Sequence, residues 1–168
     1  MEKRRELITW DEVDRLVDHL LPQFKTGFEA MVIVTRGGIV PGGLLCEALD
    51  IQNVLTAGVD FPFEVRREAS KLLAWPQFIQ FPEDDQLTGR RVLVVDDVWG
   101  SGRTITAVKN RVSAAGGVPS TCVLHFNPHR SLFTQAPPDY YAAITDAYIV
   151  YPWEIDRGLD RVMLGDSN

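Results

Sequence analysis

The sequence predicts an α/β fold in which helices flank a central, mainly parallel β-sheet. Short apolar segments alternate along the chain with segments of helical periodicity, as in α/β proteins. The apolar segments carry hydrophobic residues at consecutive positions, which is typical of strands covered on both faces. With 168 residues, of which 45% are hydrophobic and 24% charged, we expect a single domain over 1–168 with a substantial core.

The first half of the chain contains the clearest start signal of a helix. Thr9 and Glu12 form a capping-box pattern, and apolar residues follow at helical spacing, so a helix is predicted over 10–24. The next elements expected are a strand at 30–35, a helix at 40–49 with Pro41 in its first turn, and a strand at 54–57.

The segment 58–89 mixes aromatic, basic and acidic residues, and its periodicity is weak. We expect one or two strands there and a mobile excursion at 60–85. The elements predicted after it are strands at 91–95, 120–126 and 147–151, and a helix at 104–115 that ends at Gly116-Gly117. In such a sheet a ligand binds outside the carboxyl ends of the strands.

Composition indicates which classes of binding partner and which cellular compartment to expect. The net charge of −6 argues against nucleic acid held by bulk electrostatics. Cys46 and Cys122 lie in apolar segments and are interpreted as small buried hydrophobes in a reducing compartment. The sequence shows no secretion signal and no apolar run long enough for a membrane span. We therefore expect a cytoplasmic protein without nucleic-acid or membrane partners.

The stretch VLVVDDVWGSGRT, residues 92–104, carries the most specific chemistry. Asp96 and Asp97 come where an apolar strand ends, and two adjacent carboxylates there need a diol or a divalent cation to offset their repulsion. The small loop after them enters a helix, whose N-terminal N–H groups form an anion site that glycines allow to come close. Acceptors for a diol beside donors for a phosphate outline a ribose 5-phosphate.

Other interpretations of this stretch fit less well. A nucleotide-triphosphate P-loop requires a lysine that is absent here, and a dinucleotide fingerprint requires a third glycine where Ile105 stands. The acidic pair is also similar to the first strand of a receiver domain, but too few residues follow Asp97 for the rest of that fold. An ordinary strand, turn and helix with a solvated acidic end is the remaining alternative.

Residues 92–104 resemble the 5-phosphoribosyl-1-pyrophosphate (PRPP) motif of the type I phosphoribosyltransferases. Two weaker matches agree in chain order. The sequence TRGG at 35–38 is similar to the pyrophosphate loop of that family, and DAYIVYPWE at 146–154 to the base-binding tail of its xanthine-guanine branch. The resemblance covers roughly residues 7–157. It implies a type I phosphoribosyltransferase-like fold with a small base-binding hood and a mobile lid.

The resemblance also implies an activity: transfer of phosphoribosyl from PRPP to a purine base (hypoxanthine, xanthine or guanine), giving a nucleoside monophosphate and pyrophosphate. Magnesium would be the cofactor, and a homodimer or homotetramer is expected. Two alternatives stay open: a non-catalytic protein that senses PRPP or a nucleotide, and a phosphoribosyltransferase for another base.

The implied site residues fall into four groups. Asp96 and Asp97 would hold the ribose hydroxyls and, with Arg36, act in catalysis. The remaining PRPP-binding residues would be Gly37 and Gly38, in a loop where the family often has a non-proline cis peptide, and Gly100, Ser101, Gly102, Arg103 and Thr104. The base would be bound by Asn127, Tyr148, Ile149 and Glu154. Magnesium would be held by Asp96, Asp97 and Glu154, mostly through ligand or water.

The sequence departs from the purine branch at three places. Gly100 stands where that branch has an aspartate beside N7 of the base, and Asn127 where it commonly has a lysine that binds the 6-oxo group. His125 and His129 flank Asn127, and either one could supply a proton near neutral pH. The lid at 60–85 lacks the family's Ser-Tyr pair, and Arg66, Arg67 or Lys71 are the residues there that could reach pyrophosphate.

Overall fold

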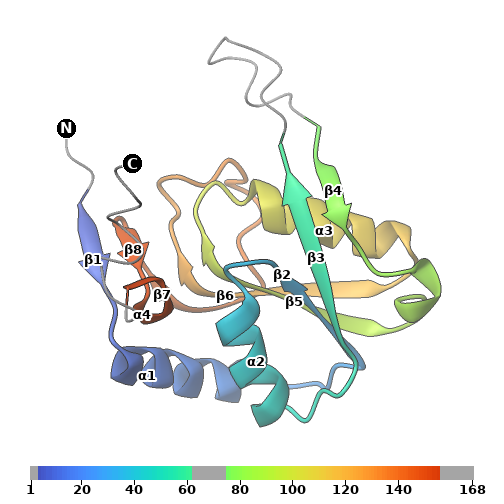
Figure 1. Cartoon of the computed structure of the whole chain (residues 1–168), viewed down its shortest axis with the longest axis horizontal. Coiled ribbons are helices and arrows are strands. Elements are labelled where there is room, and N and C mark those ends of the chain that lie inside the picture. Colours follow the sequence, from blue (N-terminus) through green and yellow to red (C-terminus); the bar gives the residue numbers. More distant parts are fainter. Residues whose placement is uncertain (1–3, 62–74, 156–168) are drawn as a thin grey trace, which may run out of the picture.

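A computed structural model describes residues 4–61 and 75–155, which form a central six-stranded sheet and a small two-stranded sheet (Figure 1). The strands of the central sheet are β2 (Ala30–Val34), β3 (Val54–Asp60), β4 (Gln77–Gln80), β5 (Arg91–Trp99), β6 (Val118–Phe126) and β7 (Tyr140–Ile144). The small sheet consists of β1 (Arg5–Leu7) and β8 (Tyr148–Val150). The helices are α1 (Trp10–Leu20), α2 (Ile39–Ala48), α3 (Arg103–Ala114) and α4 (Pro152–Ile155).

The central sheet has the strand order β4-β3-β2-β5-β6-β7. Every neighbouring pair is parallel except β3 and β4, which are antiparallel. The predicted α/β fold with a mainly parallel sheet is therefore confirmed. β5 lies at the centre, between β2 and β6, so its carboxyl end is flanked by the loops that follow both neighbours.

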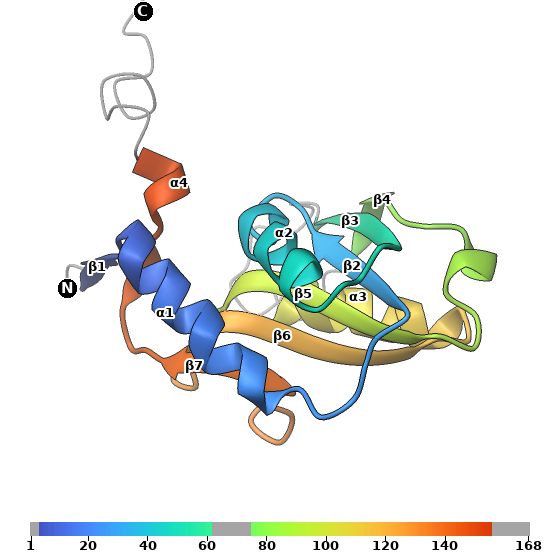
Figure 2. The same cartoon turned by 90° about the horizontal axis from the view of Figure 1, so that it is seen from below.

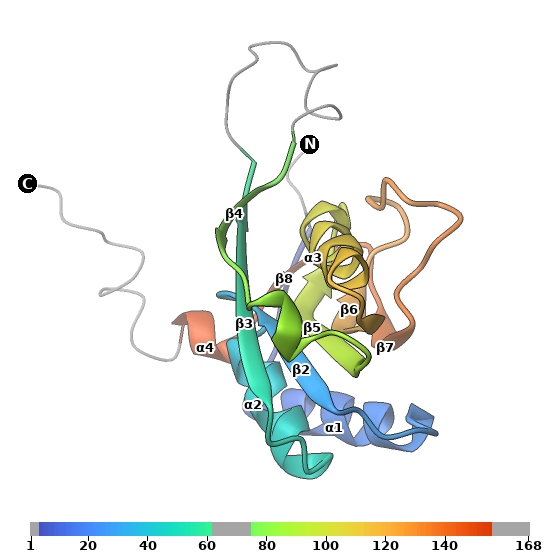
Figure 3. The ribbon, with the colours of Figure 1, turned by 90° about the vertical axis from the view of Figure 1, so that its right-hand side faces the viewer.

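Helices cover both faces of this sheet, with α1 and α2 on one face and α3 on the other (Figures 2 and 3). Two separate cores result, since alternate residues of each strand point to opposite faces. Ile33 and Leu93 belong to the core under α1 and α2, and Val32 and Val94 to the core under α3. This double burial explains why the strands are apolar at consecutive positions.

Most element boundaries agree with the sequence-based predictions, and the differences have local causes. The capping box of Thr9 and Glu12 is present, but α1 ends at Leu20 and a 3₁₀ turn containing Pro22 follows it. The prediction that the central strand ends at Val95 was wrong. β5 continues to Trp99, because Val98 and Trp99 still pair with the neighbouring strand β6.

The small sheet of β1 and β8 stands apart from the central sheet, beyond one of its ends (Figure 1), and we call it the hood. Tyr148 N donates to Arg4 O, and Ile8 N donates to Val150 O, which joins the start of the described chain to its final strand. Trp153 of α4 stacks on Tyr151 and is 6.0 Å from the ring of Trp10, so α4 is anchored to α1.

Part of the expected lid, 62–74, lies outside the described residues, and it includes Arg66, Arg67 and Lys71. What is described of the excursion is β4 and a 3₁₀ turn at Asp84–Gln86. Cys46 and Cys122 are both free thiols, and Cys122 is buried. Among the described helices, none is long and apolar enough to cross a membrane.

Candidate active site

Asp96 and Asp97 lie side by side near the carboxyl end of β5. Their carboxylates accept hydrogen bonds from backbone amides of the same strand: Asp97 N donates to Asp96 Oδ1 at 2.9 Å, and Val98 N donates to Asp97 Oδ1 at 2.6 Å. Burial raises the pKa of both groups, and the charge of Asp97 raises the pKa of Asp96 further. The fold thus holds two carboxylates where a diol or a cation would relieve their repulsion.

The loop after β2 packs directly on this acidic pair. A Cβ atom at Gly37 would lie 2.7 Å from Asp97 Cγ, and one at Gly38 would lie 2.4 Å from Val95 O. Only bare backbone fits so close to β5. The Thr35–Arg36 peptide bond is cis, as the resemblance implies. Arg36 is exposed on the same loop.

The loop that follows β5 ends at the N-terminus of α3. Gly102 is the N-cap, in the left-handed region at φ 79°. A Cβ atom there would lie 2.2 Å from Trp99 Nε1, so both backbone and space require glycine. The N-cap residue Gly102 has no side chain to cap the helix, and Arg103 N donates to Ser101 Oγ at 3.4 Å. The first N–H groups of the helix have no intrahelical acceptor. The guanidinium of Arg103 lies over the Phe61 ring, and backbone donors therefore dominate this anion site.

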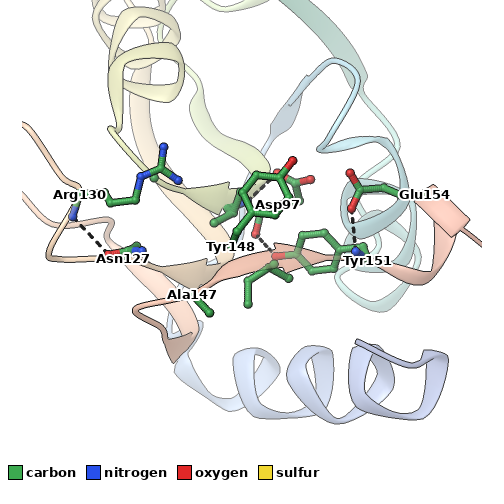
Figure 4. Close-up of a pocket in the computed structure, with 10 residues that line it drawn as sticks. Asp97, Asn127, Arg130, Ala147, Tyr148, Tyr151 and Glu154 are labelled. Atoms are coloured by element: carbon green, nitrogen blue, oxygen red, sulfur yellow. Dashed lines mark hydrogen bonds between the residues drawn. The ribbon is translucent and has the colours of Figure 1, made fainter. Parts of the chain in front are cut away.

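A pocket of about 150 Å³ opens between this loop and the hood (Figure 4). It is lined by residues of β5 and its loop, of the segment after β6, and of β8 and α4. These are Asp97, Val98, Gly100, Asn127, Arg130, Ala147, Tyr148, Ile149, Tyr151 and Glu154.

The hood contributes an aromatic face and a backbone edge to the pocket. Tyr148 is 47% exposed, which leaves its ring available for stacking. The residues on either side of Ile149 bond to β1. The amide of Ile149 therefore faces the other way, away from β1, because successive amides alternate in direction along a strand. Glu154 Oε2 accepts from Tyr151 N at 2.6 Å, so one of its oxygens already has a partner.

Asn127 begins the turn that follows β6. Its side chain is buried, and Oδ1 accepts from the backbone N–H groups of His129 and Arg130. Nδ2 is buried without a hydrogen-bond partner in the described part of the chain. An unpaired buried donor that lines a pocket indicates a position where a ligand acceptor belongs.

Gly100 shows no backbone requirement for glycine. A Cβ atom there would be in ordinary contact with Arg130, 3.6 Å from Nη1. The two loops are tied together around it, since Asn127 N donates to Trp99 O and Leu132 N donates to Ser101 O. Arg130 thus stands beside the place where the purine branch has its aspartate.

Tyr151 is a site residue for which no role was predicted from the sequence. Its hydroxyl donates to Asp97 O at 3.0 Å and lies 2.9 Å from His125 Nδ1. Because the hydroxyl hydrogen goes to Asp97, His125 must donate from Nδ1 to the hydroxyl oxygen. Burial lowers the pKa of His125 and raises that of Tyr151, which keeps both neutral. Neither His125 nor His129 lines the pocket.

The structure therefore brings together six of the predicted residues around one pocket: Asp97, Gly100, Asn127, Tyr148, Ile149 and Glu154. The other predicted residues, Arg36, Gly37, Gly38, Asp96, Ser101, Gly102, Arg103 and Thr104, lie on the neighbouring loops and strand. Sequence reasoning missed Arg130 and Tyr151. The Asn-Pro dipeptide at 127–128 signals a turn and could have drawn attention to Arg130.

The metal role of Asp96, Asp97 and Glu154 stays a prediction. Within residues 4–61 and 75–155, no three or more His, Cys, Asp or Glu side chains gather closely enough to hold an ion by themselves. This donor set fits magnesium that keeps several waters and binds largely through substrate oxygens, because Mg²⁺ sites of that kind need only one or two carboxylates.

A mainly parallel sheet with an acidic pair on its central strand, a glycine loop leading into a helix and a hood over the pocket defines the fold of the type I phosphoribosyltransferases. Within that class the chain is similar to the xanthine-guanine phosphoribosyltransferase of Desulfotalea psychrophila. The two are 25% identical over 168 aligned residues, which cover 97% of this chain and 94% of the relative. The resemblance predicted from the sequence is therefore confirmed.

Solved structures agree with this assignment of the fold. The purine phosphoribosyltransferase of Pyrococcus horikoshii is 28% identical with a TM-score of 0.75, over 89% of this chain and 93% of that one. A hypothetical protein of Neisseria gonorrhoeae with bound ppGpp is 22% identical with a TM-score of 0.74, over 96% and 97% of the two chains; that likeness concerns the fold alone. No family model matches the chain.

Proposed function

We propose that this protein is an enzyme that transfers phosphoribosyl from PRPP to a 6-oxopurine base and releases pyrophosphate. The observation that carries the proposal is a pocket lined together by Asp97 of the acidic pair, Tyr148, Ile149 and Asn127 with its unpaired donor. The similarity to xanthine-guanine and purine phosphoribosyltransferases supports the same conclusion.

The reaction breaks the bond between C1 of the ribose and the pyrophosphate oxygen and forms a bond from C1 to a nitrogen of the base. That nitrogen loses its proton, and pyrophosphate leaves with the bonding electrons. The transition state resembles a ribosyl cation, so the protein acts mainly by position and electrostatics.

Each part of the site has a role in this scheme. Asp96 and Asp97 accept hydrogen bonds from the 2- and 3-hydroxyls of the ribose. The loop from Gly100 to Thr104 holds the 5-phosphate at the N-terminus of α3, mostly through backbone N–H groups. Arg36 and the bare backbone of Gly37 and Gly38 hold the pyrophosphate beside the carboxylates.

The base binds under the hood. Tyr148 stacks on its face, the Ile149 backbone reads one edge, and Asn127 Nδ2 donates to the 6-oxo group. Glu154 holds a substituent of the base or a metal-bound water. Magnesium, held by Asp96, Asp97 and Glu154 through water and substrate oxygens, would offset the charge of the leaving pyrophosphate.

Incubation of the purified protein with PRPP, magnesium and a panel of bases tests the proposal. Hypoxanthine, guanine or xanthine should be converted to the nucleoside monophosphate, whereas adenine and orotate should not. Chromatography of the nucleotides with a parallel pyrophosphate assay gives the readout. If only adenine or orotate is consumed, the proposed base class is wrong.

A second candidate is a non-catalytic protein that senses PRPP or a nucleotide. Gly100 favours it, because a glycine cannot give the proton-transfer help that is typically worth about 100- to 10,000-fold in rate. Saturable binding of PRPP without consumption of any base would support this candidate over the enzyme. We also propose that the protein works in the cytoplasm as a homodimer or homotetramer.

A further inference from the structure

The amide of Asn127 has one fixed orientation. Its Oδ1 accepts from His129 N at 3.1 Å and from Arg130 N at 3.2 Å. A flipped amide would place its NH₂ group against these two N–H donors, which is unfavourable. Hydrogen bonds within the turn therefore occupy the acceptor Oδ1 of Asn127, and only the Nδ2 donor remains for a ligand (Figure 4).

Arg130 extends the same edge of the pocket. It lines the pocket with Asn127, and its guanidinium is in contact distance of the position a Gly100 Cβ would take. Among the described residues, no ion pair involves Arg130. A guanidinium has donors only, so the two side chains of this edge offer hydrogen-bond donors to a ligand.

The acidic groups of the pocket lie elsewhere on its lining. Asp97 comes from β5 and Glu154 from α4, and the titratable tyrosines 148 and 151 come from the hood strand and the residue after it. Figure 4 shows Asn127 and Arg130 together on one side and Glu154 on the other. The pocket is thus divided into a donor edge and an acidic edge.

We propose that Asn127 Nδ2 and the Arg130 guanidinium together recognise the oxygen and the N7 lone pair of a 6-oxopurine, with Arg130 as the specificity-determining residue in the space that Gly100 leaves open. The inference rests on the proposed function and specifies its substrate edge. The same chemistry underlies the pairing of arginine with O6 and N7 of guanine. A 6-amino group, which is a donor, meets two donors here and is rejected.

Gly100 has a positive role in this arrangement. A carboxylate at that position would reach the guanidinium and pair with it, which would remove the donor from N7. Arg130 cannot accept a proton. It therefore selects the form of the base whose N7 is unprotonated. Arg130 thus recognises N7, but it does not take over the proton-transfer role of the absent aspartate.

Binding of guanosine monophosphate and of its 7-deaza analogue, in which C–H replaces N7, tests the proposal by calorimetry. The wild-type protein should bind the analogue at least about tenfold more weakly, as expected for loss of a charge-assisted hydrogen bond. Arg130→Met should bind both nucleotides alike to within about twofold. Arg91→Met, at an exposed arginine at the other end of β5, is the matched control and should behave as wild type.

Substitution of Gly100 provides a second, independent test of the proposal. Gly100→Asp should abolish the preference for N7 by pairing with Arg130, whereas the uncharged Gly100→Asn should retain most of it. The proposal would be overturned if wild type and Arg130→Met lose the same affinity when N7 is replaced, or if wild type loses none. Failure of wild type to bind guanosine monophosphate would also overturn it. Nucleotide binding with the N7 preference but without turnover would instead refute the proposed enzyme and leave this inference standing.

Discussion

Two glycines of the loop after β5, Gly100 and Gly102, lie two residues apart and are under different structural constraints. Gly102 combines a positive φ of 79° with a Cβ position 2.2 Å from Trp99 Nε1. Gly100 has neither constraint. The two glycines cannot be distinguished from the sequence, because the residue type reveals neither the dihedral angle φ nor the atoms that a Cβ would contact.

Alanine should therefore destabilise the protein at Gly102 and have little effect at Gly100. Gly102→Ala should lose more than about 2 kcal/mol of unfolding free energy from backbone strain and the clash with Trp99, and should lose PRPP binding. Gly100→Ala should stay within about 0.5 kcal/mol of wild type. Urea unfolding and calorimetric PRPP titration measure both; equal stabilities of the two variants would contradict the loop geometry.

The acidic pair illustrates a conflict between stability and function at the level of single side chains. Burial and mutual repulsion raise the pKa of Asp96 above its ordinary value. The native state then binds a proton more readily than the unfolded state, so this group disfavours folding at neutral pH and the penalty fades as pH falls toward about 4.

Asp96→Asn should consequently stabilise the protein by about 1–2 kcal/mol near neutral pH and abolish PRPP binding. The gain should shrink at mildly acidic pH, where Asp96 of the wild type becomes protonated. His125, whose pKa is lowered by burial, destabilises both proteins equally as pH falls, so it cancels in the comparison. Urea unfolding of both proteins at two pH values is the measurement; a variant less stable than wild type at neutral pH would contradict this account.

Among the elements, the tie between the hood and the central sheet is the most consequential for the site. The Tyr151 hydroxyl bridges Asp97 O and His125 Nδ1, and the Tyr151 ring stacks on Trp153 at 4.4 Å. The residue after β8 thereby fixes the backbone of the acidic pair. Tyr151 is a positioning residue, because it acts on the ribose site through Asp97.

Removal of this hydroxyl tests the tie. Tyr151→Phe keeps the ring stack but leaves two buried polar atoms without a partner, which should cost about 1–3 kcal/mol of unfolding free energy. The KM for PRPP should rise, since the Asp97 backbone loses its support. Tyr140→Phe, at a ring whose hydroxyl has no hydrogen bond among the described residues, should do neither; a Tyr151→Phe protein with wild-type KM would refute the positioning role.

The elements also show what sequence reasoning can and cannot reach. α1, α2, α3 and the buried strands were predicted because each has enough residues for a periodicity, a cap or an apolar run. β1 has only three residues and β7 is partly exposed, so neither periodicity nor burial identifies them reliably. The strand predicted at 147–151 is present as β8, although it too has only three residues. β5 extends past its apolar part through pairing with β6, which is a tertiary effect.

On the scale of the whole molecule, parallel strands bring distant segments to one end of the sheet. Residues 35–38, 96–104 and 127–130 meet there because they lie at the carboxyl ends of adjacent parallel strands. The hood residues 148–154 join them through the hydrogen bonds of Tyr151 to Asp97 and His125. The site residues contributed by motifs were therefore predictable from sequence. The orientation of the Asn127 amide and the place of Arg130 were not, because they depend on a turn that closes only when β6 lies beside β5.

Formation of nucleotide and pyrophosphate from PRPP and guanine is the most direct test of the proposed function. Wild-type protein with magnesium should yield guanosine monophosphate and pyrophosphate in equal amounts. Asp97→Asn should reduce kcat/KM by at least about 100-fold while the protein stays folded by circular dichroism. The account would be contradicted if wild type binds PRPP saturably and leaves guanine, hypoxanthine and xanthine all unconsumed.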